Sequence, residues 1–155
     1  MIWSGREVAK WILEAQPESI QPNGVDLTVS EIYVFKEQGS ILRDKRYIPK
    51  YDQLHGNKWT LNPGAYLVRY GEFVKIPLDA IGIVLPRSSL LRMGATIYTA
   101  VWDSGYEGRG VGLLHVFNPN GIRIRKGARI CQIIFLEARA SGEYSGDYKF
   151  EGITE

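Results

Sequence analysis

Apolar and polar residues alternate along most of the chain, and this pattern predicts short β-strands. Residues 25–29 and 122–125 are clear cases, because every second side chain is apolar. Gly, Pro or Asn separates most of these runs, as turns between strands require. We expect strands over residues 25–35, 59–69, 72–76, 81–85, 96–101, 112–117, 122–125 and 129–136.

The first residues follow a helical pattern instead. Ser4 and Glu7 have the spacing of a capping box, and apolar residues follow at positions 8, 11, 12 and 15. Pro17 ends this pattern. The sequence therefore predicts one short helix at the amino terminus.

Two segments lack a clear period. Residues 38–57 are polar and basic, and we expect them to form a long surface excursion. Residues 138–155 begin with small and polar side chains, which is typical of a flexible end. This tail nevertheless contains Tyr148, Lys149 and Phe150, two rings and a base that suit a segment closing over a flat ligand.

The succession of strands predicts an all-β fold, an antiparallel barrel or sandwich of the jelly-roll kind with a short N-terminal helix across one end. Too few helices are predicted for a parallel α/β sheet. The whole chain, residues 1–155, is expected to be a single domain with residues 138–155 as a flexible closing tail.

Composition narrows the function classes. The chain has 155 residues, 45% of them hydrophobic, and a formal net charge of +2, which is typical of one globular domain. Such a balance argues against a broad basic surface for duplex DNA or RNA, so no nucleic-acid partner is expected. Neither a secretion signal nor a membrane-spanning run is recognisable, and we expect a cytoplasmic protein with one buried thiol, Cys131.

Two short segments after apolar strands carry the candidate chemistry. Arg87, Ser88 and Ser89 offer a forked cation and two hydroxyl groups to phosphate oxygens, although a capped turn into one helical turn at residues 90–93 is favoured on these residues alone. Asp103 follows the apolar residues 99–102, so it could polarise a water molecule or cap the next turn.

Five segments together resemble the motif pattern of the dUTPase and dCTP deaminase superfamily. They are Asn23-Gly24-Val25-Asp26-Leu27, Pro86-Arg87-Ser88-Ser89-Leu90, Val101-Trp102-Asp103-Ser104-Gly105-Tyr106-Glu107-Gly108, Ala128-Arg129-Ile130-Cys131-Gln132-Ile133-Ile134-Phe135 and Lys149-Phe150-Glu151-Gly152. The N-terminal helix and Arg92 resemble the dCTP deaminase branch. The glycine-rich residues 108–112 are similar to the archaeal dUTPases within that branch.

This resemblance implies a homotrimer of distorted β jelly rolls with active sites at the subunit boundaries. It implies Mg²⁺-dependent hydrolysis of dUTP to dUMP and pyrophosphate, which removes dUTP from the nucleotide pool and supplies dUMP. Asp103 matches the carboxylate that orients the attacking water, and Tyr106 matches the ring that excludes a 2′-hydroxyl. The remaining matches are Arg87, Ser88, Ser89 and Gln132 for the triphosphate, Asp26 for Mg²⁺ through water, and Lys149 and Phe150 for the closing tail.

Two alternatives stay open. Deaminases of this superfamily carry a glutamate on the strand after the aspartate motif, and His115 occupies that position here. Loss of the carboxylate favours a dUTPase over a dCTP deaminase or a bifunctional enzyme, although histidine can also transfer protons. A nucleotide-binding regulatory β module is the non-enzymatic alternative, because a fold does not decide function.

Overall fold

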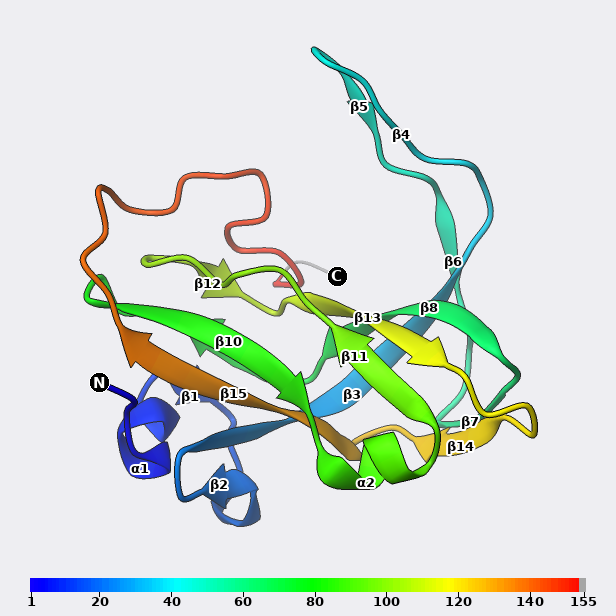
Figure 1. Cartoon of the computed structure of the whole chain (residues 1–155), viewed down its shortest axis with the longest axis horizontal. Helices are drawn as coiled ribbons and strands as arrows, with labels where there is room; N and C mark the ends of the chain where they lie inside the picture. The colour runs from blue at the N-terminus through cyan, green and yellow to red at the C-terminus, as the bar shows by residue number, and fades with distance from the viewer. Residues whose placement is uncertain (154–155) are drawn as a thin grey trace.

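The computed structural model describes residues 1–153 and consists almost entirely of short strands (Figure 1). Its helices are α1 (Gly5–Ala9), the 3₁₀ turn Pro17–Ser19 and α2 (Ser88–Arg92). The strands are β1 (Ile12–Leu13), β2 (Ile20–Gln21), β3 (Gly24–Phe35), β4 (Ser40–Ile41), β5 (Arg46–Tyr47), β6 (Tyr51–Gln53), β7 (Lys58–Leu61), β8 (Gly64–Tyr70), β9 (Phe73–Lys75), β10 (Ala80–Pro86), β11 (Ala95–Tyr98), β12 (Glu107–Gly108), β13 (Val111–Val116), β14 (Ile122–Arg125) and β15 (Arg129–Glu137).

The main sheet curves into a nearly closed barrel. Strands β10, β15, β3, β8, β13 and β11 lie side by side in this order, and each neighbouring pair is antiparallel. Gly82 on β10 and Trp102 beyond β11 then exchange two backbone hydrogen bonds, of 2.9 and 3.1 Å, which bring the two edges together. The expected all-β jelly-roll barrel is confirmed.

The barrel core follows from the alternation in the sequence. Along β13 and β15 every second side chain points inward, and Leu114, Ile133 and Phe135 are fully buried. Cys131 is also fully buried among these strands, as expected, and its burial raises the pKa of the thiol. The outward positions of the same strands are left for site residues such as Gln132.

Helix α1 is shorter than the helical pattern predicts. The capping box of Ser4 and Glu7 is present, but the helix ends at Ala9. Ile12 instead pairs with Val74 in a short antiparallel strand, and Lys75 N–H donates to Trp11 C=O at 2.8 Å. Pairing with β9 therefore overrides the local helical preference, while Ile12 keeps its buried position.

The predicted strand over residues 59–69 is divided in two. Pro63 interrupts it, so β7 pairs with β14 and β8 joins the main sheet. The other strands lie within three residues of the predicted ends.

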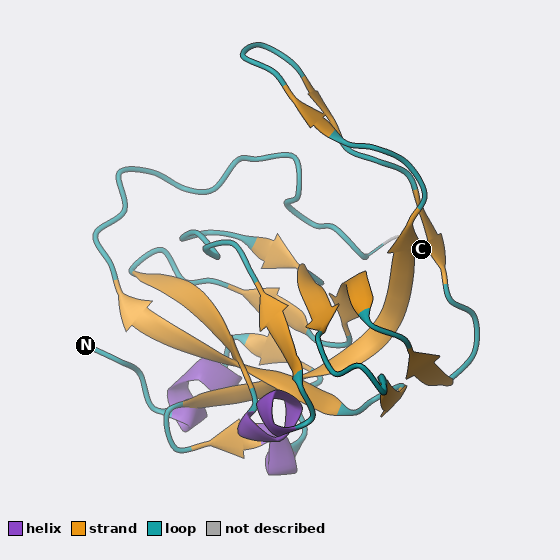
Figure 2. Ribbon diagram, turned by 45° about the vertical axis from the view of Figure 1, so that its right-hand side comes forward, coloured by secondary structure: helices purple, strands orange, loops and turns teal. Residues whose placement is uncertain are grey.

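Residues 36–53 form a two-stranded arm that projects from the barrel (Figures 1 and 2). Strands β4 and β5 pair near its tip, and β6 returns to pair with the end of β3. Ile41 is 90% exposed and Leu42 is 64% exposed on this arm. The segment is thus a surface excursion, as expected, although it contains short strands that its sequence pattern does not predict.

None of the helices in residues 1–153 has the length and apolar character that crossing a bilayer requires.

Candidate active site

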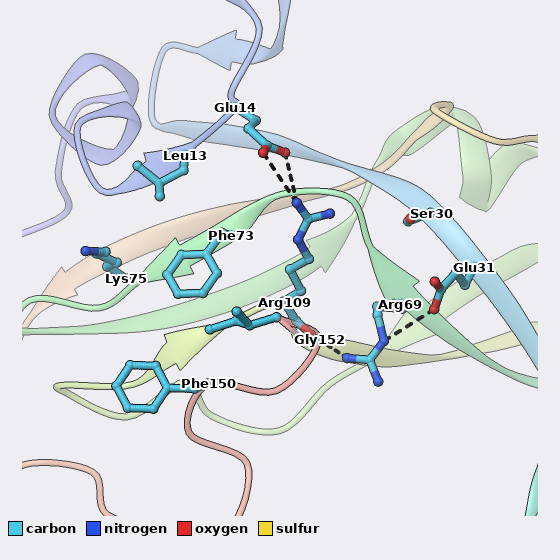
Figure 3. A pocket seen from close by; sticks show the side chains of 11 residues that line it. Leu13, Glu14, Ser30, Glu31, Arg69, Phe73, Lys75, Arg109, Phe150 and Gly152 are labelled. Carbon is cyan, nitrogen blue, oxygen red and sulfur yellow. Dashed lines mark hydrogen bonds and ion pairs between the residues drawn. The ribbon is translucent and has the colours of Figure 1, made fainter. Parts of the chain in front are cut away.

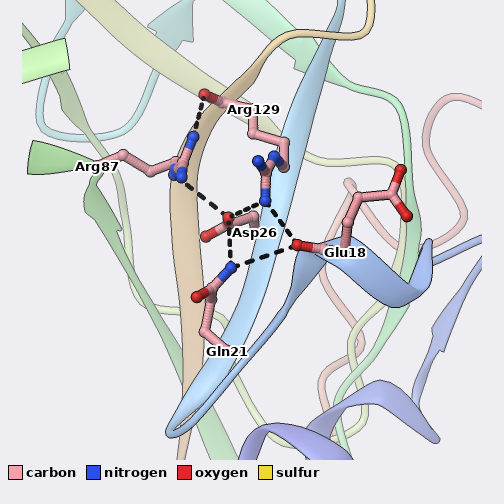
Figure 4. Close-up of polar contacts among 5 residues, drawn as sticks. All are labelled: Glu18, Gln21, Asp26, Arg87 and Arg129. Carbon is pink, nitrogen blue, oxygen red and sulfur yellow. Dashed lines mark hydrogen bonds and ion pairs between the residues drawn. The ribbon is translucent and has the colours of Figure 1, made fainter. Parts of the chain in front are cut away.

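Asp26 lies at the centre of a polar cluster at one end of the barrel (Figure 4). Its side chain is only 2% exposed, and its Oδ2 atom lies 3.2 Å from Arg87 Nε and 3.3 Å from Arg129 Nη1. Gln21 Nε2 donates a further hydrogen bond of 3.0 Å to the same oxygen. Burial raises the pKa of the Asp26 carboxyl, and the two guanidinium groups oppose this shift.

Three strands bring this cluster together. Strand β15 lies between β10 and β3, with Gln132 directly opposite Asp26 and with Cys131 opposite Pro86. Arg87 follows β10 immediately, so its side chain reaches the carboxylate from the other side of β15. Antiparallel pairing thus gathers residues from the first, second and fourth sequence motifs.

The segment after β10 turns into the short helix α2, as the residues alone favoured, but the helix starts at Ser88 and its N-cap residue makes no side-chain cap hydrogen bond. Arg87 is the N-cap residue of α2, and its C=O accepts the Leu90 N–H at 3.0 Å. Ser88 and Ser89 occupy the first two helical positions, and both are exposed. This conformation leaves both hydroxyl groups open to solvent, so the turn and a phosphate-binding role are compatible.

A cavity of about 420 Å³ lies against this cluster. It is lined by Gln21, Pro22, Asn23, Asp26, Pro86, Arg87, Ser88 and Gln132. Arg87 uses Nε toward Asp26 and Nη1 toward the Arg129 carbonyl, at 3.4 Å. A guanidinium has five N–H donors, so this arrangement leaves the others for an anionic ligand.

Asp103 and Tyr106 border a different cavity, of about 330 Å³. Its lining residues are Ala100, Val101, Trp102, Asp103, Tyr106, Gly110, Val111, Tyr144, Tyr148 and Glu151. The Asp103 carboxylate is exposed, whereas the ring of Tyr106 is 6% exposed and forms part of the wall. The volume lies within the range of small-molecule sites, and the wall is rich in aromatic rings.

Backbone contacts hold the Asp103–Tyr106 turn in place. Tyr106 N–H donates to Asp103 C=O at 3.1 Å, and Gly105 adopts φ +82°, which suits glycine. Ile76 receives the Gly105 N–H at 3.0 Å and returns its own N–H to Tyr106 C=O at 2.8 Å. The turn therefore presents the carboxylate from a backbone that is bonded on both sides.

Part of the tail, residues 144–151, lies along this turn. Tyr144 N–H donates to Ser104 C=O at 2.8 Å, and the Tyr144 ring meets the Tyr106 ring edge to face at 5.7 Å. Lys149 forms a 2.5 Å ion pair with Glu143 and lies 5.6 Å from the centre of the Phe150 ring. Lys149 and Phe150 thus lie beside the Asp103 cavity without lining it.

Six of the nine predicted site residues fall into two groups within one chain, whereas Ser89, Lys149 and Phe150 line neither cavity. Asp26, Arg87, Ser88 and Gln132 share one cavity, whereas Asp103 and Tyr106 share the other, and no lining residue is common to both. Gly82 marks the Asp103 end of β10 through its bridge to Trp102, and Pro86 marks the Arg87 end. Four residues of strand separate these ends, which corresponds to about 13 Å.

His115 and Arg92 lie outside both cavities. The His115 ring stacks on Phe117, with centroids 3.9 Å apart, and its backbone pairs with Ala65 and Thr96 in the sheet. Arg92 is exposed in the last turn of α2. This position agrees with the interpretation of His115 as a residue that packs along its strand.

Several residues of the site were not assigned a role from the sequence. Gln21 and Arg129 hold Asp26, Glu151 accepts the hydrogen bond of the Tyr106 hydroxyl, and Arg69 lies 4.0 Å from the Glu151 carboxylate. Arg129 and Glu151 lie inside motif segments. Their closeness in sequence to the assigned residues could therefore have indicated that they belong to the site. For Gln21 and Arg69 no such signal exists, because their contacts depend on strand register.

Among residues 1–153, no group of three or more His, Cys, Asp or Glu side chains could hold a metal ion. Asp26 accepts its contacts on Oδ2, and no hydrogen bond from the described residues reaches Oδ1. The donor set therefore fits an ion that keeps its water shell and binds mainly to a ligand's own oxygens.

Comparison with known families gives a match over most of the chain. Residues 2–138 match the family model described as dCTP deaminase-like. The matched range includes every predicted site residue except Lys149 and Phe150 of the tail.

Archaeal proteins are similar to this chain over nearly their full length. The deoxyuridine 5′-triphosphate nucleotidohydrolase of Methanocaldococcus jannaschii is 45% identical over 141 residues, covering 86% of this chain and 89% of the relative. A protein of Aeropyrum pernix named as a probable enzyme of the same kind is 43% identical over 139 residues, covering 87% of each chain.

Solved structures share the fold at low sequence identity. A 2′-deoxycytidine 5′-triphosphate deaminase from Agrobacterium tumefaciens has a TM-score of 0.66 at 21% identity, covering 90% of this chain. This chain spans 48% of that deaminase chain. A dUTPase of Staphylococcus bacteriophage 80alpha has a TM-score of 0.52 at 14% identity, covering 88% of this chain and 95% of that chain.

Proposed function

The chain belongs to the dCTP deaminase-like family, and from this premise we propose that it hydrolyses dUTP to dUMP and pyrophosphate. One observation carries the proposal: Asp103 and Tyr106 line one cavity in a chain that is 43–45% identical to archaeal proteins named as dUTP nucleotidohydrolases. We propose the cytoplasm as its compartment, where it removes dUTP from the nucleotide pool and supplies dUMP.

Asp103 acts as the general base of this reaction. Its exposed carboxylate accepts a proton from a water molecule, whose oxygen attacks the α-phosphorus while the bond to the oxygen that bridges to the β-phosphate breaks. Pyrophosphate leaves, and dUMP retains the water oxygen. Tyr106 forms the wall under the deoxyribose, where a ring edge leaves no space for a 2′-hydroxyl.

The Asp26 cluster binds the triphosphate. Arg87 neutralises developing charge on the phosphate oxygens, and Ser88 and Gln132 donate hydrogen bonds from the same cavity wall. Ser89 adds a second exposed hydroxyl at the start of α2. Phosphoryl transfer depends mainly on such positioning and charge stabilisation.

A Mg²⁺ ion bound to the triphosphate would supply further charge neutralisation, with Asp26 holding its water shell through Oδ1. The proposed ion needs no cage of protein carboxylates. Lys149 and Phe150 complete the site from the tail, the ammonium group at a phosphate and the ring near the base. For this contact Lys149 must leave its ion pair with Glu143.

We propose that the protein forms a ring of three chains with the site at each boundary. Asp103 and Arg87 both have to act on one dUTP molecule, yet they line different cavities near two ends of β10 that are about 13 Å apart in one chain. Two copies therefore have to combine different surfaces. Such a contact is heterologous, and heterologous contacts form a closed ring when the rotation between successive copies closes.

Exposed apolar side chains support this assembly. Leu85 and Leu91 flank Arg87 and are each 54% exposed, whereas Val101, beside Asp103, is 59% exposed. Apolar groups around both half-sites would be covered if the half-sites of adjacent chains meet. The trimer number itself rests on the family resemblance.

Incubation of the purified protein with dUTP, and separately with dCTP, in the presence of Mg²⁺ tests the activity. Nucleotides, pyrophosphate and ammonia are resolved in each reaction. We expect dUMP and pyrophosphate from dUTP, and no ammonia from dCTP because His115 replaces the deaminase glutamate and lies outside the Asp103 cavity.

Ammonia from dCTP would identify a deaminase or a bifunctional enzyme. If neither substrate is changed while dUMP binds, the regulatory nucleotide-binding module becomes the better description. The Asp103→Asn variant is the control for contaminating phosphatases.

A further inference from the structure

The hydroxyl group of Tyr106 is anchored by the tail. It donates a 2.7 Å hydrogen bond to Glu151 Oε1, while its ring is held edge to face between Trp102, at 5.1 Å, and Tyr144, at 5.7 Å. Burial and the neighbouring carboxylate both raise the pKa of Tyr106, so the hydroxyl stays protonated and remains a donor. Among residues 1–153, Glu151 is therefore the hydrogen-bond acceptor that anchors the ring.

Glu151 is itself held from two directions. Arg109 N–H donates to the Glu151 C=O at 2.9 Å, and Arg69 Nη1 lies 4.0 Å from the second carboxylate oxygen. The Arg69 side chain is 8% exposed, faces Glu31 at 3.5 Å and donates to Arg109 C=O at 2.8 Å (Figure 3). A buried, bonded guanidinium thus fixes the position of the tail carboxylate.

Two glycines allow this close approach. A Cβ on Gly108 would lie 2.8 Å from the Tyr106 hydroxyl and 3.2 Å from the Glu151 backbone. Gly152 has φ +70°, and a Cβ there would lie 2.8 Å from Arg109 Cβ and 2.9 Å from Arg69 Nη1. Strand β12 and the tail therefore both have a glycine, without a side chain, at the point where they meet.

We propose that Glu151 is a positioning residue for sugar specificity, because it fixes the ring of Tyr106 in the orientation that excludes a 2′-hydroxyl. This inference rests on the proposed function. Glu151 does not touch the reacting atoms, and it acts through the ring alone. Without the carboxylate, the buried hydroxyl has to find another acceptor, and the ring edge shifts away from the sugar.

The test compares kcat/KM for dUTP and for UTP in full-length Glu151→Leu and Glu151→Gln. The leucine variant is expected to lower the dUTP preference by about 10-fold or more, since a small displacement of a positioning group has effects of this size. Glutamine retains an acceptor oxygen, so its preference should stay within about threefold of wild type. Asp147→Asn is the matched control, because it removes a tail charge that pairs with Arg46 and does not contact Tyr106.

A second set of variants separates this role from simple stabilisation. Tyr106→Phe removes the hydroxyl group and keeps the ring. If Glu151 acts through that hydroxyl, Tyr106→Phe lowers the preference as well, and the double variant Tyr106→Phe, Glu151→Leu shows no further loss. The proposal would be overturned if the losses of dUTP preference in the two single variants multiply in the double variant. It would also be overturned if the ratio of kcat/KM for dUTP to kcat/KM for UTP is unchanged in Glu151→Leu.

Binding of dUMP and UMP, followed by titration calorimetry, distinguishes the two failures. If the wild-type protein binds dUMP more tightly than UMP yet leaves dUTP intact, the proposed hydrolysis alone is refuted. The role of Glu151 is then measured in the variants as the ratio of the dissociation constants of UMP and dUMP. Wild-type protein with hydrolysis but no sugar preference refutes the role of Glu151 alone.

Discussion

Asp26 and Asp103 are both aspartates near strand ends, and their surroundings give them different tasks. Asp26 is buried and lies within ion-pair distance of two arginines, so only its Oδ1 atom is left for the proposed contact with the water shell of Mg²⁺. Asp103 is exposed at the rim of a cavity, and its carboxylate remains accessible to water. The same side chain is therefore a buried partner of two arginines in one place and an accessible carboxylate, our proposed base, in the other.

Substitution Asp103→Asn tests the proposed base. We expect kcat for dUTP to fall by about 10²- to 10⁴-fold, because an amide cannot accept the proton from water. Nucleotide affinity and melting temperature should change little, since the carboxylate is exposed. Titration with a non-hydrolysable dUTP analogue and a steady-state assay together check this prediction. Wild-type turnover in the variant would remove Asp103 from the mechanism.

Glu72 supplies a pH-dependent test of the fold. This carboxylate is 6% exposed and accepts hydrogen bonds from Thr28 N–H and Thr28 Oγ1 at 2.9 and 2.8 Å. Burial raises the pKa of Glu72, and the bonds from Thr28 oppose the shift. The folded state thus binds more protons than the unfolded state above about pH 4.5.

The stability that Glu72 contributes is consequently present at low pH and declines as the pH rises through the folded-state pKa. Glutamine at position 72 can keep both contacts, because the Thr28 hydroxyl can reverse its direction, and it carries no charge. We expect the free energy of unfolding of wild type, relative to Glu72→Gln, to fall between pH 4.5 and 7. Urea unfolding of both proteins across this range measures the difference, and a constant difference would contradict the argument.

At the scale of elements, short-range pattern and long-range pairing compete. The Ser4–Glu7 capping box initiates α1 as the sequence indicates, but pairing with β9 ends the helix after five residues. Pro63 divides one predicted strand, and the projecting arm contains strands where no period is visible. Strand positions were thus largely predictable, whereas the ends of elements depended on partners far along the chain.

The tail is the element whose removal is most informative. Deletion of residues 147–155 eliminates the Tyr106–Glu151 hydrogen bond and the backbone bonds from Phe150 to Glu107 and from Arg109 to Glu151. The barrel strands end at Glu137 and remain intact. We expect kcat/KM for dUTP to fall by about 10²-fold, because closure over the ligand is lost.

The melting temperature of the truncated protein should fall by only about 5 °C or less, since most of the released backbone groups regain water. Calorimetry of the two proteins measures this. A decrease of about 15 °C or more would instead assign the tail to the folding core. The tail's expected flexibility stays a prediction, and residues 154 and 155 lie outside the described part of the chain.

For the whole molecule, the division of the site predicts a test by complementation. Asp103→Asn and Arg87→Ala each inactivate one half-site, and each is expected to lack activity alone. When the two variants are unfolded together and refolded as an equal mixture, some boundaries combine an intact Asp103 from one copy with an intact Arg87 from its neighbour.

Random assembly gives such a boundary at about one site in four, so we expect about a quarter of wild-type activity from the mixture. The variants refolded separately and then mixed without exchange are the control. No recovery in the co-refolded mixture would mean that a complete site lies within one chain.

Features that depend on near neighbours could be predicted from the amino-acid sequence. Alternation set the strands and the buried face, the capping box set the start of α1, and the motif segments contained Asp103, Tyr106 and Arg87. A period or a turn signal involves residues only a few positions apart, so it can be read along the chain.

Which of these residues meet depends instead on the three-dimensional fold. Strand register places Arg129 on Asp26, Asp103 and Arg87 border different cavities, and the returning tail brings Glu151 to Tyr106. Contacts between residues 45 to 103 positions apart leave no local pattern, because any of several registers would satisfy the same alternation. The register is set by the packing of the whole barrel.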